Sequence, residues 1–176
     1  MSREAPLNMP LEPPLDSVQV AQIATLLGRA PRGLEAIAVR NATGDPAVIR
    51  VASLVDDKPF PTLFWLVDSE LNYRLDQLEA SGLIRQLQQQ VHADETLRAS
   101  LAEDHRRYIA LREQYMSPSI KQRLEALGYY QALQRRGIGG IADFSCIRCL
   151  HTHYAAHLFE SNTLGRWLDS EFLISN

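Results

Sequence analysis

The sequence predicts an α+β fold, in which a small antiparallel sheet of about three strands packs with four to five α-helices. Short runs rich in β-branched and aromatic residues lie between positions 34 and 67, and turn residues separate them. Apolar residues recur at helical spacing through most of the C-terminal two-thirds, which is therefore expected to be rich in helix. The 176 residues, 45% of them apolar, suit one globular domain.

The N-terminal segment differs from the rest in composition. Residues 1–15 hold four prolines among small polar and apolar residues, so they are expected to form an extended, flexible tail. The single α+β domain is expected to span residues 16–176. Its first helix is capped by Asp16 or Ser17 and ends before Gly28. The inward residues of this helix are expected to be Val20, Ile23 and Leu27.

Three strands follow in the prediction. Leu34–Arg40 and Val48–Leu54 are short apolar runs, and residues 41–46 between them are rich in turn formers. The third run, Phe60–Val67, is apolar on both faces, as expected of a strand covered on both sides. Pro61 places its beginning at an edge or in irregular structure. These strands are expected to form an antiparallel meander.

The remaining elements are expected to be helices. Asp68 and Asp94 each precede apolar residues at helical spacing, and Gly82 interrupts the first of these patterns before it continues. Ser117 and Pro118 end the second pattern. The last two helices are expected at about residues 120–134 and 145–160, with a flexible glycine-rich loop between them.

The composition limits the partners and the compartment. The net charge of −3 provides no overall basic field, so no nucleic-acid partner is expected. No apolar run approaches the roughly 20 residues that cross a bilayer, and no secretory signal precedes the domain, so no membrane partner is expected. The two cysteines are too few for a stapled secreted scaffold, and a cytoplasmic location is expected.

The main concentration of reactive side chains is the segment from Cys146 to His157. If it is helical, Cys149, His153 and His157 lie on one face, with Cys146 one turn earlier. Cys149 and His157 would be about 12 Å apart along the axis, too far to share one ion directly. Cys146, Cys149, His153 and His157 are therefore candidate metal ligands in two overlapping sets, for zinc or another divalent metal.

Other uses of this segment stay open. If it begins as a strand, Cys149, His151 and His153 alternate onto one face and form a candidate catalytic cluster. A cysteine at a helix N-terminus beside Arg148 and several imidazoles also suits nucleophilic chemistry. Alternatively, the cysteines and histidines pack internally and have no chemical role.

Three further residues are candidates for ligand binding. His105 lies on the inward stripe of its helix, where it can be a distant metal ligand, a general base or a hydrogen-bonded buried residue. Arg32 lies between Pro31 and Gly33 and is the arginine best placed for an anion. Thr62 is the one polar side chain in an apolar run and can reach a ligand or its own backbone.

Five motifs stand out along the chain: Gly28-Arg29-x-Pro31-Arg32-Gly33, Pro59-Phe60-Pro61-Thr62-Leu63-Phe64-Trp65-Leu66, Gly139-Gly140-Ile141, Cys149-Leu150-His151-x-His153-Tyr154 and Asn162-x-x-Gly165. Together they resemble the bacterial family of domain of unknown function 501, over about residues 20–168. The resemblance implies no established activity. It matches Cys149 and His151 but not Cys146, so it favours Cys149, His151 and His153 with His105. It also implies Asn162 as a ligand-binding residue.

Two functions remain compatible with these patterns. The first is an enzyme or binding protein that uses the Cys/His segment, with or without a metal, on a small anionic ligand. Genes of related actinobacterial proteins often lie near that of an exopolyphosphatase, so the resemblance favours a phosphate-type ligand. The second is a non-catalytic regulatory or interaction module in which the same segment is structural. Neither the reaction nor the oligomeric state follows from the sequence.

Overall fold

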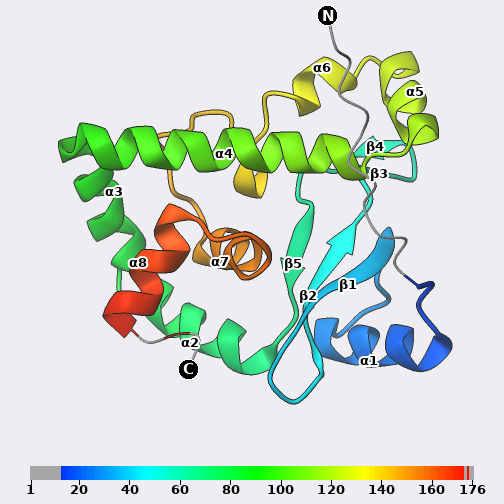
Figure 1. The fold of residues 1–176 in the computed structure, drawn as a ribbon, viewed down its shortest axis with the longest axis horizontal. Coiled ribbons are helices and arrows are strands. Elements are labelled where there is room, and N and C mark those ends of the chain that lie inside the picture. Colours follow the sequence, from blue (N-terminus) through cyan, green and yellow to red (C-terminus); the bar gives the residue numbers. More distant parts are fainter. Residues whose placement is uncertain (1–12, 173, 175–176) are drawn as a thin grey trace, which may run out of the picture.

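The computed structural model describes residues 13–172 and residue 174, and Figure 1 shows their arrangement. The predicted tail therefore lies mostly outside the described residues. The strands are β1 (Leu34–Arg40), β2 (Pro46–Val51), β3 (Leu54–Val55), β4 (Lys58–Pro59) and β5 (Phe64–Leu66). The helices are α1 (Ser17–Leu27), α2 (Ser69–Ala80), α3 (Leu83–Ala93), α4 (Glu95–Tyr115), α5 (Pro118–Ala126), α6 (Tyr130–Leu133), α7 (Leu150–Phe159) and α8 (Thr163–Phe172), with a 3₁₀ turn at Ile138–Gly140.

The predicted α+β class and the three-stranded antiparallel sheet are confirmed. The strand order is β1-β2-β5, so β2 is central, and all six of its residues are buried. The third predicted strand is shorter than expected because Pro61 cannot donate a ladder hydrogen bond, and β5 begins only at Phe64. The small hairpin of β3 and β4 forms in the expected break between the second and third runs.

Two hydrophobic cores lie on the two faces of this sheet. On one face α1 buries Ile23 against Ile49, Val51 and Val67, and Trp65 packs against this cluster. Val20 was expected to face inward but is 37% exposed, and the one buried residue of this helix is Ile23. On the other face the larger core joins β2 and β5 to the C-terminal helices. The sheet is therefore covered on both sides, while one edge of β5 has no strand partner among the described residues.

Helix α7 is the centre of the larger core. Figure 1 shows it nearly end-on, with α4, β5, α2 and α8 around it. Half of its ten residues are buried, namely Leu150, His153, Tyr154, Ala155 and Ala156. A helix surrounded on most sides needs small or apolar residues around its circumference, which these positions supply. The N-terminal end of α7 lies beside α2, and this end carries the residues of interest.

The C-terminal part is helix-rich as predicted, but the described residues form eight α-helices rather than four to five. The predicted helix over 120–134 is divided at Gly128, whose φ of 75° ends α5 before α6 begins. The helix expected from about Ser145 begins only at Leu150, and α8 follows it as a separate helix. No helix in the described part of the chain is long and apolar enough to cross a membrane.

Helix α4 fixes the approach to β5 through two polar side chains. The Tyr108 hydroxyl accepts a hydrogen bond of 2.6 Å from the backbone N–H of Leu63. The Arg112 guanidinium, only 1% exposed, donates at 2.5–2.8 Å to three backbone carbonyls, those of Pro61, Leu133 and Arg136. Because an unpaired buried carbonyl is costly, these bonds hold the proline-rich segment against α4 and so position β5.

Candidate metal site at the start of helix α7

Cys149 is the residue that precedes the first turn of α7. Its backbone is extended, with φ −151° and ψ 124°, and the helix begins at the next residue. This geometry places its Sγ 3.7 Å from Nδ1 of His151, two positions further along. The helical prediction is therefore correct for the body of the segment. However, the helix starts too late for Cys149 to share a helix face with His153 and His157.

Glu79, near the C-terminal end of α2, completes the cluster. Its Oε1 accepts the first free N–H of α7, that of Leu150, at 2.6 Å and lies 3.1 Å from Nδ1 of His151. A carboxylate and a thiol at this position both benefit from the partial positive charge of a helix N-terminus. The ligand atoms of Glu79, Cys149 and His151 all lie within 4.8 Å of one another.

The spacing of these atoms fits one small metal ion. Tetrahedral zinc with bonds of about 2.3 Å to sulfur and 2.0–2.1 Å to nitrogen and oxygen places N and O about 3.3 Å apart, and S and N about 3.6 Å apart. The observed distances are 3.1 Å between His151 Nδ1 and Glu79 Oε1, and 3.7 Å between Cys149 Sγ and His151 Nδ1. These two distances fit zinc, and the sulfur and the carboxylate oxygen lie within 4.8 Å of each other. Three protein ligands would leave one coordination position of a tetrahedral ion open.

The other ring nitrogen of His151 also has partners on α2. Its Nε2 lies 3.1 Å from Oδ1 of Asp76 and 3.3 Å from the carbonyl oxygen of Asn72. Metal-ligating histidines commonly donate their second N–H to a carboxylate or carbonyl, which fixes the tautomer and orients the ring. Asn72, Asp76 and Glu79 lie on successive turns of α2, so this one helix supplies both the ligand and the orienting groups.

These contacts change the protonation of His151. The hydrogen bond with Cys149, followed by the charges of Cys149 and Glu79 and the Asn72 carbonyl, raises the pKa of His151 to about 9, although burial opposes the rise. At neutral pH the metal-free imidazole is therefore protonated. A metal ion must displace this proton, so binding is expected to weaken as the pH falls.

The remaining predicted metal ligands lie elsewhere. The Cys146 thiol donates to Asp143 at 3.3 Å, and this bond raises the pKa of the Cys146 thiol. His157 bonds through Nε2 to Asp169 at 2.9 Å, while its Nδ1 accepts the Asn162 N–H at 3.1 Å. Within the described ranges, neither Cys146 nor His157 belongs to a group of three ligand atoms as close as that of Cys149.

Asn162, expected to bind a ligand, instead joins α7 to α8. Its side chain donates to the His153 carbonyl at 2.8 Å and accepts the Gly165 N–H at 2.8 Å, which caps the start of α8. Gly165 lies so close to His157 that a Cβ built there would be 1.9 Å from the imidazole Cγ. These contacts explain the Asn162-x-x-Gly165 motif by packing.

His105 and His153 form a separate pair in the core. Both side chains are fully buried, and their rings meet edge to face with centroids 5.5 Å apart. His105 Nδ1 accepts the Ile138 N–H at 3.0 Å, and this ring stacks on Phe144 at 4.8 Å. Burial lowers the pKa of His105 to about 4 and that of His153 to about 3. The structure thus divides the predicted cluster in two. Cys149 and His151 lie beside Glu79 near the surface, whereas His105 and His153 form a neutral pair in the core.

Comparison with known proteins gives one decisive match. Residues 37–170 match the model of the family described as protein of unknown function (DUF501). The chain belongs to the DUF501 family. No curated protein and no solved structure matches it. The family resemblance predicted from the motifs is confirmed, and the function of this DUF501 protein has to be argued from its own residues.

A pocket in the DUF501 protein lies beside the Glu79/Cys149/His151 cluster. It has a volume of about 250 Å³ and is lined by Thr62, Phe64, Trp65, Leu66, His151 and Thr152, so it lies between β5 and the first turn of α7. His151 is the residue shared by the pocket and the cluster. Of the predicted ligand-binding residues, Thr62 thus lines this pocket. Its volume is slightly below the range of about 300–1,000 Å³ for drug-sized ligands, which suits a small molecule.

The open edge of β5 contributes backbone groups to this side of the DUF501 fold. Leu63 and Val67 bond to β2 through their backbone, so by the alternation of an antiparallel ladder Phe64 and Leu66 direct their N–H and C=O groups away from β2. The Phe64 N–H reaches the Tyr108 hydroxyl at 3.4 Å, and the Leu66 carbonyl accepts from Asn72 at 3.2 Å.

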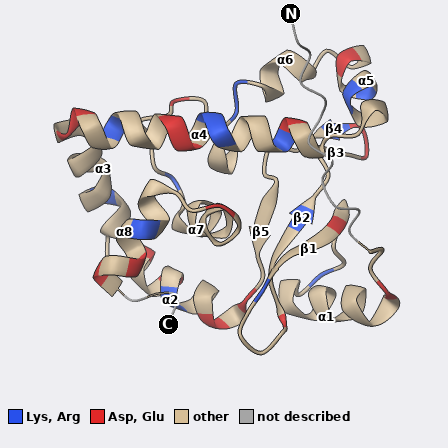
Figure 2. Ribbon diagram, viewed as in Figure 1, with Lys and Arg blue, Asp and Glu red and all other residues tan. Residues whose placement is uncertain are grey.

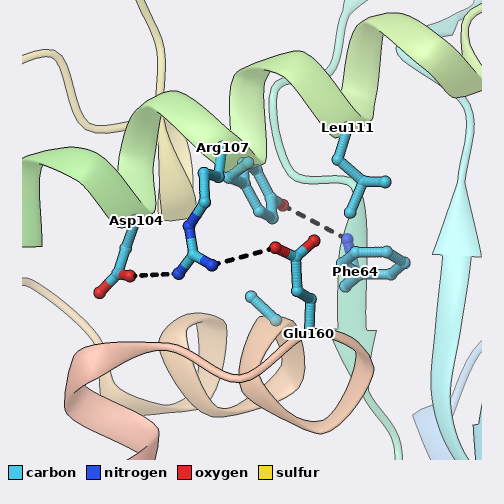
Figure 3. A pocket seen from close by; sticks show the side chains of 7 residues that line it. Phe64, Asp104, Arg107, Leu111 and Glu160 are labelled. Atoms are coloured by element: carbon cyan, nitrogen blue, oxygen red, sulfur yellow. Dashed lines mark hydrogen bonds and ion pairs between the residues drawn. The ribbon is translucent and has the colours of Figure 1, made fainter.

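A second hollow between α4 and α7 does not serve as a ligand site. Figure 3 shows the Arg107 guanidinium there between the carboxylates of Asp104 and Glu160, at 2.7 Å and 3.2 Å. The space that remains is about 20 Å³, which is enough for about one water molecule. Asp104 also accepts the Thr163 N–H at 2.8 Å. These ion pairs fasten the turn between α7 and α8 to α4.

Sequence reasoning identified Cys149 and His151 but missed Glu79, Asp76 and Asn72. The acidic residues at 76 and 79 are one helical turn apart, yet such pairs are common on exposed helix faces. About 70 residues separate them from His151 in the sequence, so no local pattern connects the two segments. Their meeting depends on the packing of α2 beside α7.

Proposed function

We propose that this DUF501 protein binds a divalent transition metal, best zinc, through Glu79, Cys149 and His151. The ion is presented to a small anionic ligand in the pocket between β5 and α7. The single observation that carries the proposal is the grouping of one sulfur, one nitrogen and one carboxylate oxygen, from two segments far apart in the chain, within 4.8 Å of one another. Such a bound ion supplies a Lewis acid that polarises an oxygen of the ligand or lowers the pKa of a bound water.

The chain's own residues support a ligand-binding role beside the metal. Asp76 and the Asn72 carbonyl hold the His151 ring, so that its Nδ1 is directed to the cluster. The Thr62 and Thr152 side chains also line the pocket. The N-terminus of α7 favours negative charge on the bound molecule, while the Glu79 carboxylate and a Cys149 thiolate would balance the charge of a divalent ion. The ion would therefore act on the ligand through its open coordination position.

Cobalt(II) is the direct probe of the metal site, because a thiolate–cobalt bond gives a near-ultraviolet charge-transfer band. The untagged protein is expected to show this band and to bind cobalt with a 1:1 stoichiometry. Cys149→Ser should abolish the band, Glu79→Gln should weaken binding about tenfold or more, and the matched thiol control Cys146→Ser should retain both. A band that persists in Cys149→Ser and disappears in Cys146→Ser would contradict the assignment.

The ligand part of the proposal is tested on the cobalt-loaded protein. Inorganic phosphate is expected to shift the cobalt absorption bands saturably, while chloride at the same ionic strength does not. Thr62→Val, which keeps the volume but removes the hydroxyl, is expected to weaken this effect without changing cobalt affinity. If the protein binds cobalt but phosphate does not shift the bands, the proposed metal site stands and the proposed phosphate-type ligand is wrong.

A second candidate function rests on one specific observation. Cys149, His151 and Asp76 form a cysteine–histidine–aspartate arrangement. Cys149 Sγ lies 3.7 Å from His151 Nδ1, and His151 Nε2 lies 3.1 Å from Asp76 Oδ1. Under this function Cys149 is a nucleophile, and His151 and Asp76 orient and charge-balance it. Metal-free protein should then react with iodoacetamide faster at Cys149 than at Cys146. Asp76→Asn should slow the reaction of Cys149 alone, and ordinary model-thiol rates would remove this function.

A further inference from the structure

A basic pocket lies on the opposite face of the sheet from α7. Its volume is about 200 Å³, and its lining comprises three cationic side chains, Arg29, Arg32 and Lys58, with Phe60, Trp65 and Asp56. The cations come from the segment between α1 and β1 and from β4. Figure 2 shows how Lys and Arg, in blue, are distributed along the ribbon. Two of the family motifs, separated by about thirty residues, therefore meet at one concave surface.

The charges of this pocket favour a dianion. Asp56 forms an ion pair with Arg32 and is the one carboxylate among the lining residues. Three cations against one carboxylate leave two positive charges, which match the charge of −1.5 to −2 on a phosphomonoester near neutral pH. A net acidic protein that concentrates two positive charges in one hollow is better explained by an anionic ligand than by general solvation.

The hydrogen-bond donors in the pocket are available. The Arg29 guanidinium lies over the Trp65 ring, 4.9 Å from its centroid, a contact that orients the group and uses none of its N–H donors. Phe60 packs against the same indole at 5.6 Å between centroids. The indole Nε1 of Trp65 is buried and has no hydrogen-bond partner among the described residues. Buried indole N–H groups usually have a partner, so this unpaired donor is unusual.

The rim of the pocket is rigid. Asp56 and Asp57 form the turn between β3 and β4, and both have positive φ, 50° and 57°, in the region that favours glycine. The two carboxylates hold this unfavourable turn in place, because Asp56 pairs with Arg32 and Asp57 accepts from Arg123 at 2.6 Å and 2.9 Å. The turn thereby fixes Arg32 at the mouth of the pocket, next to Lys58.

We infer that this pocket binds the phosphate group of a small soluble phosphomonoester, held by Arg29, Arg32 and Lys58. A concave site of this size suits a free small molecule better than a flat membrane surface. The inference goes beyond the proposed metal site, and none of these residues is a proposed metal ligand. Failure of one proposal therefore leaves the other intact.

Trp65 provides the assay, since the chain contains only two tryptophans. In a Trp167→Phe background, the fluorescence of Trp65 reports on the basic pocket and on the pocket beside α7, because Trp65 lines both. The Arg29 and Lys58 variants assign the signal to the basic pocket. Glycerol 3-phosphate is expected to change the fluorescence saturably and to give a matching isotherm by calorimetry, at constant ionic strength set with chloride. Arg29→Gln and Lys58→Gln should each weaken binding about tenfold, the loss expected for one charge-assisted hydrogen bond.

The matched control is Arg85→Gln, which removes one exposed arginine from α3. It should change the affinity by less than about twofold, as expected for a distant screened charge. Arg29→Lys, which keeps the charge, should retain part of the affinity lost in Arg29→Gln. Absence of binding by calorimetry, or equal weakening in Arg85→Gln, overturns the inference. Binding to vesicles that contain phosphatidic acid but not to glycerol 3-phosphate overturns it as well.

Discussion

Acidification from pH 6.5 to pH 5 is expected to destabilise the protein through the buried pair His105 and His153. Both side chains have no measurable exposure, and three of their four ring nitrogens have no partner among the described residues. Burial lowers the pKa of His105 to about 4 and that of His153 to about 3. The folded protein therefore keeps both rings neutral at a pH where an unfolded chain protonates them.

The sign and the size follow from proton linkage. An unfolded histidine has a pKa of about 6.5, so above this pH neither state binds the proton and the stability is constant. Below it the unfolded state binds more protons, and each buried histidine removes about 1.4 kcal/mol of unfolding free energy per pH unit. At pH 5 the loss is about 2 kcal/mol for one ring and about 4 kcal/mol for the pair. A further loss continues down to the folded pKa values.

His151 changes the unfolding free energy in the opposite direction, and it does so at higher pH. Because its pKa is raised to about 9, the folded state holds a proton that the unfolded state loses above about 6.5. Its contribution is therefore fully present below pH 6.5 and is lost as the pH rises towards 9. Between pH 5 and pH 6.5 His151 is protonated in both states, so the effect of the buried pair can be measured there separately.

Urea unfolding at pH 6.5, 5.75 and 5, followed by circular dichroism, measures this dependence. His153→Gln should remove about half of the pH dependence, whereas the exposed control His92→Gln should leave it unchanged. If His153→Gln does not fold, the nitrogen chemical shifts of the wild-type imidazoles give the same answer, because both buried rings should remain neutral at pH 5. A wild-type stability that is flat from pH 6.5 to pH 5 would refute the reasoning.

Three further predictions concern the packing and the metal site. Arg112→Met should lower the unfolding free energy by about 3 kcal/mol in a urea titration, because it leaves three buried carbonyls without a donor. The exposed control Arg106→Met should lower it by less than about 0.5 kcal/mol. Gly165→Ala should cost about 3 kcal/mol in the same assay, since the added Cβ collides with His157; a change below about 1 kcal/mol would contradict this packing. Zinc at about a hundred times its Kd should raise the unfolding free energy by about 2.7 kcal/mol in the wild type and leave Cys149→Ser unaffected, measured by thermal unfolding with and without chelator.

Local signals in the sequence predicted most elements correctly. Asp16, Asp68 and Asp94 cap the helices as expected, and Gly28 ends α1 in the left-handed conformation. These features depend on the backbone within one turn, so neighbouring residues are sufficient to specify them. The third strand was predicted too long, because its apolar character reflects burial, whereas strand length depends on which backbone groups find a ladder partner.

The candidate site shows where local reasoning ends. Helical periodicity grouped Cys149 with His153 and His157, but that grouping assumes that the helix has already begun at Cys149. The N–H of Leu150 instead takes Glu79 as its first acceptor, so Cys149 remains extended and turns towards His151. A shift of a few residues in a helix boundary thus changes which side chains share a face.

The sequence by itself determined that a Cys/His-rich segment leads into a helix, because spacing and composition are local properties, and the family resemblance favoured Cys149, His151 and His153 with His105. Only the tertiary structure decided what these residues contact. The packing of α2 beside α7 brought Glu79 to the thiol and the imidazole, and the burial of α7 placed His153 beside His105 in the core. The physical reason is that a metal site needs atoms a few ångströms apart from segments far apart in the chain, and only the fold sets that distance.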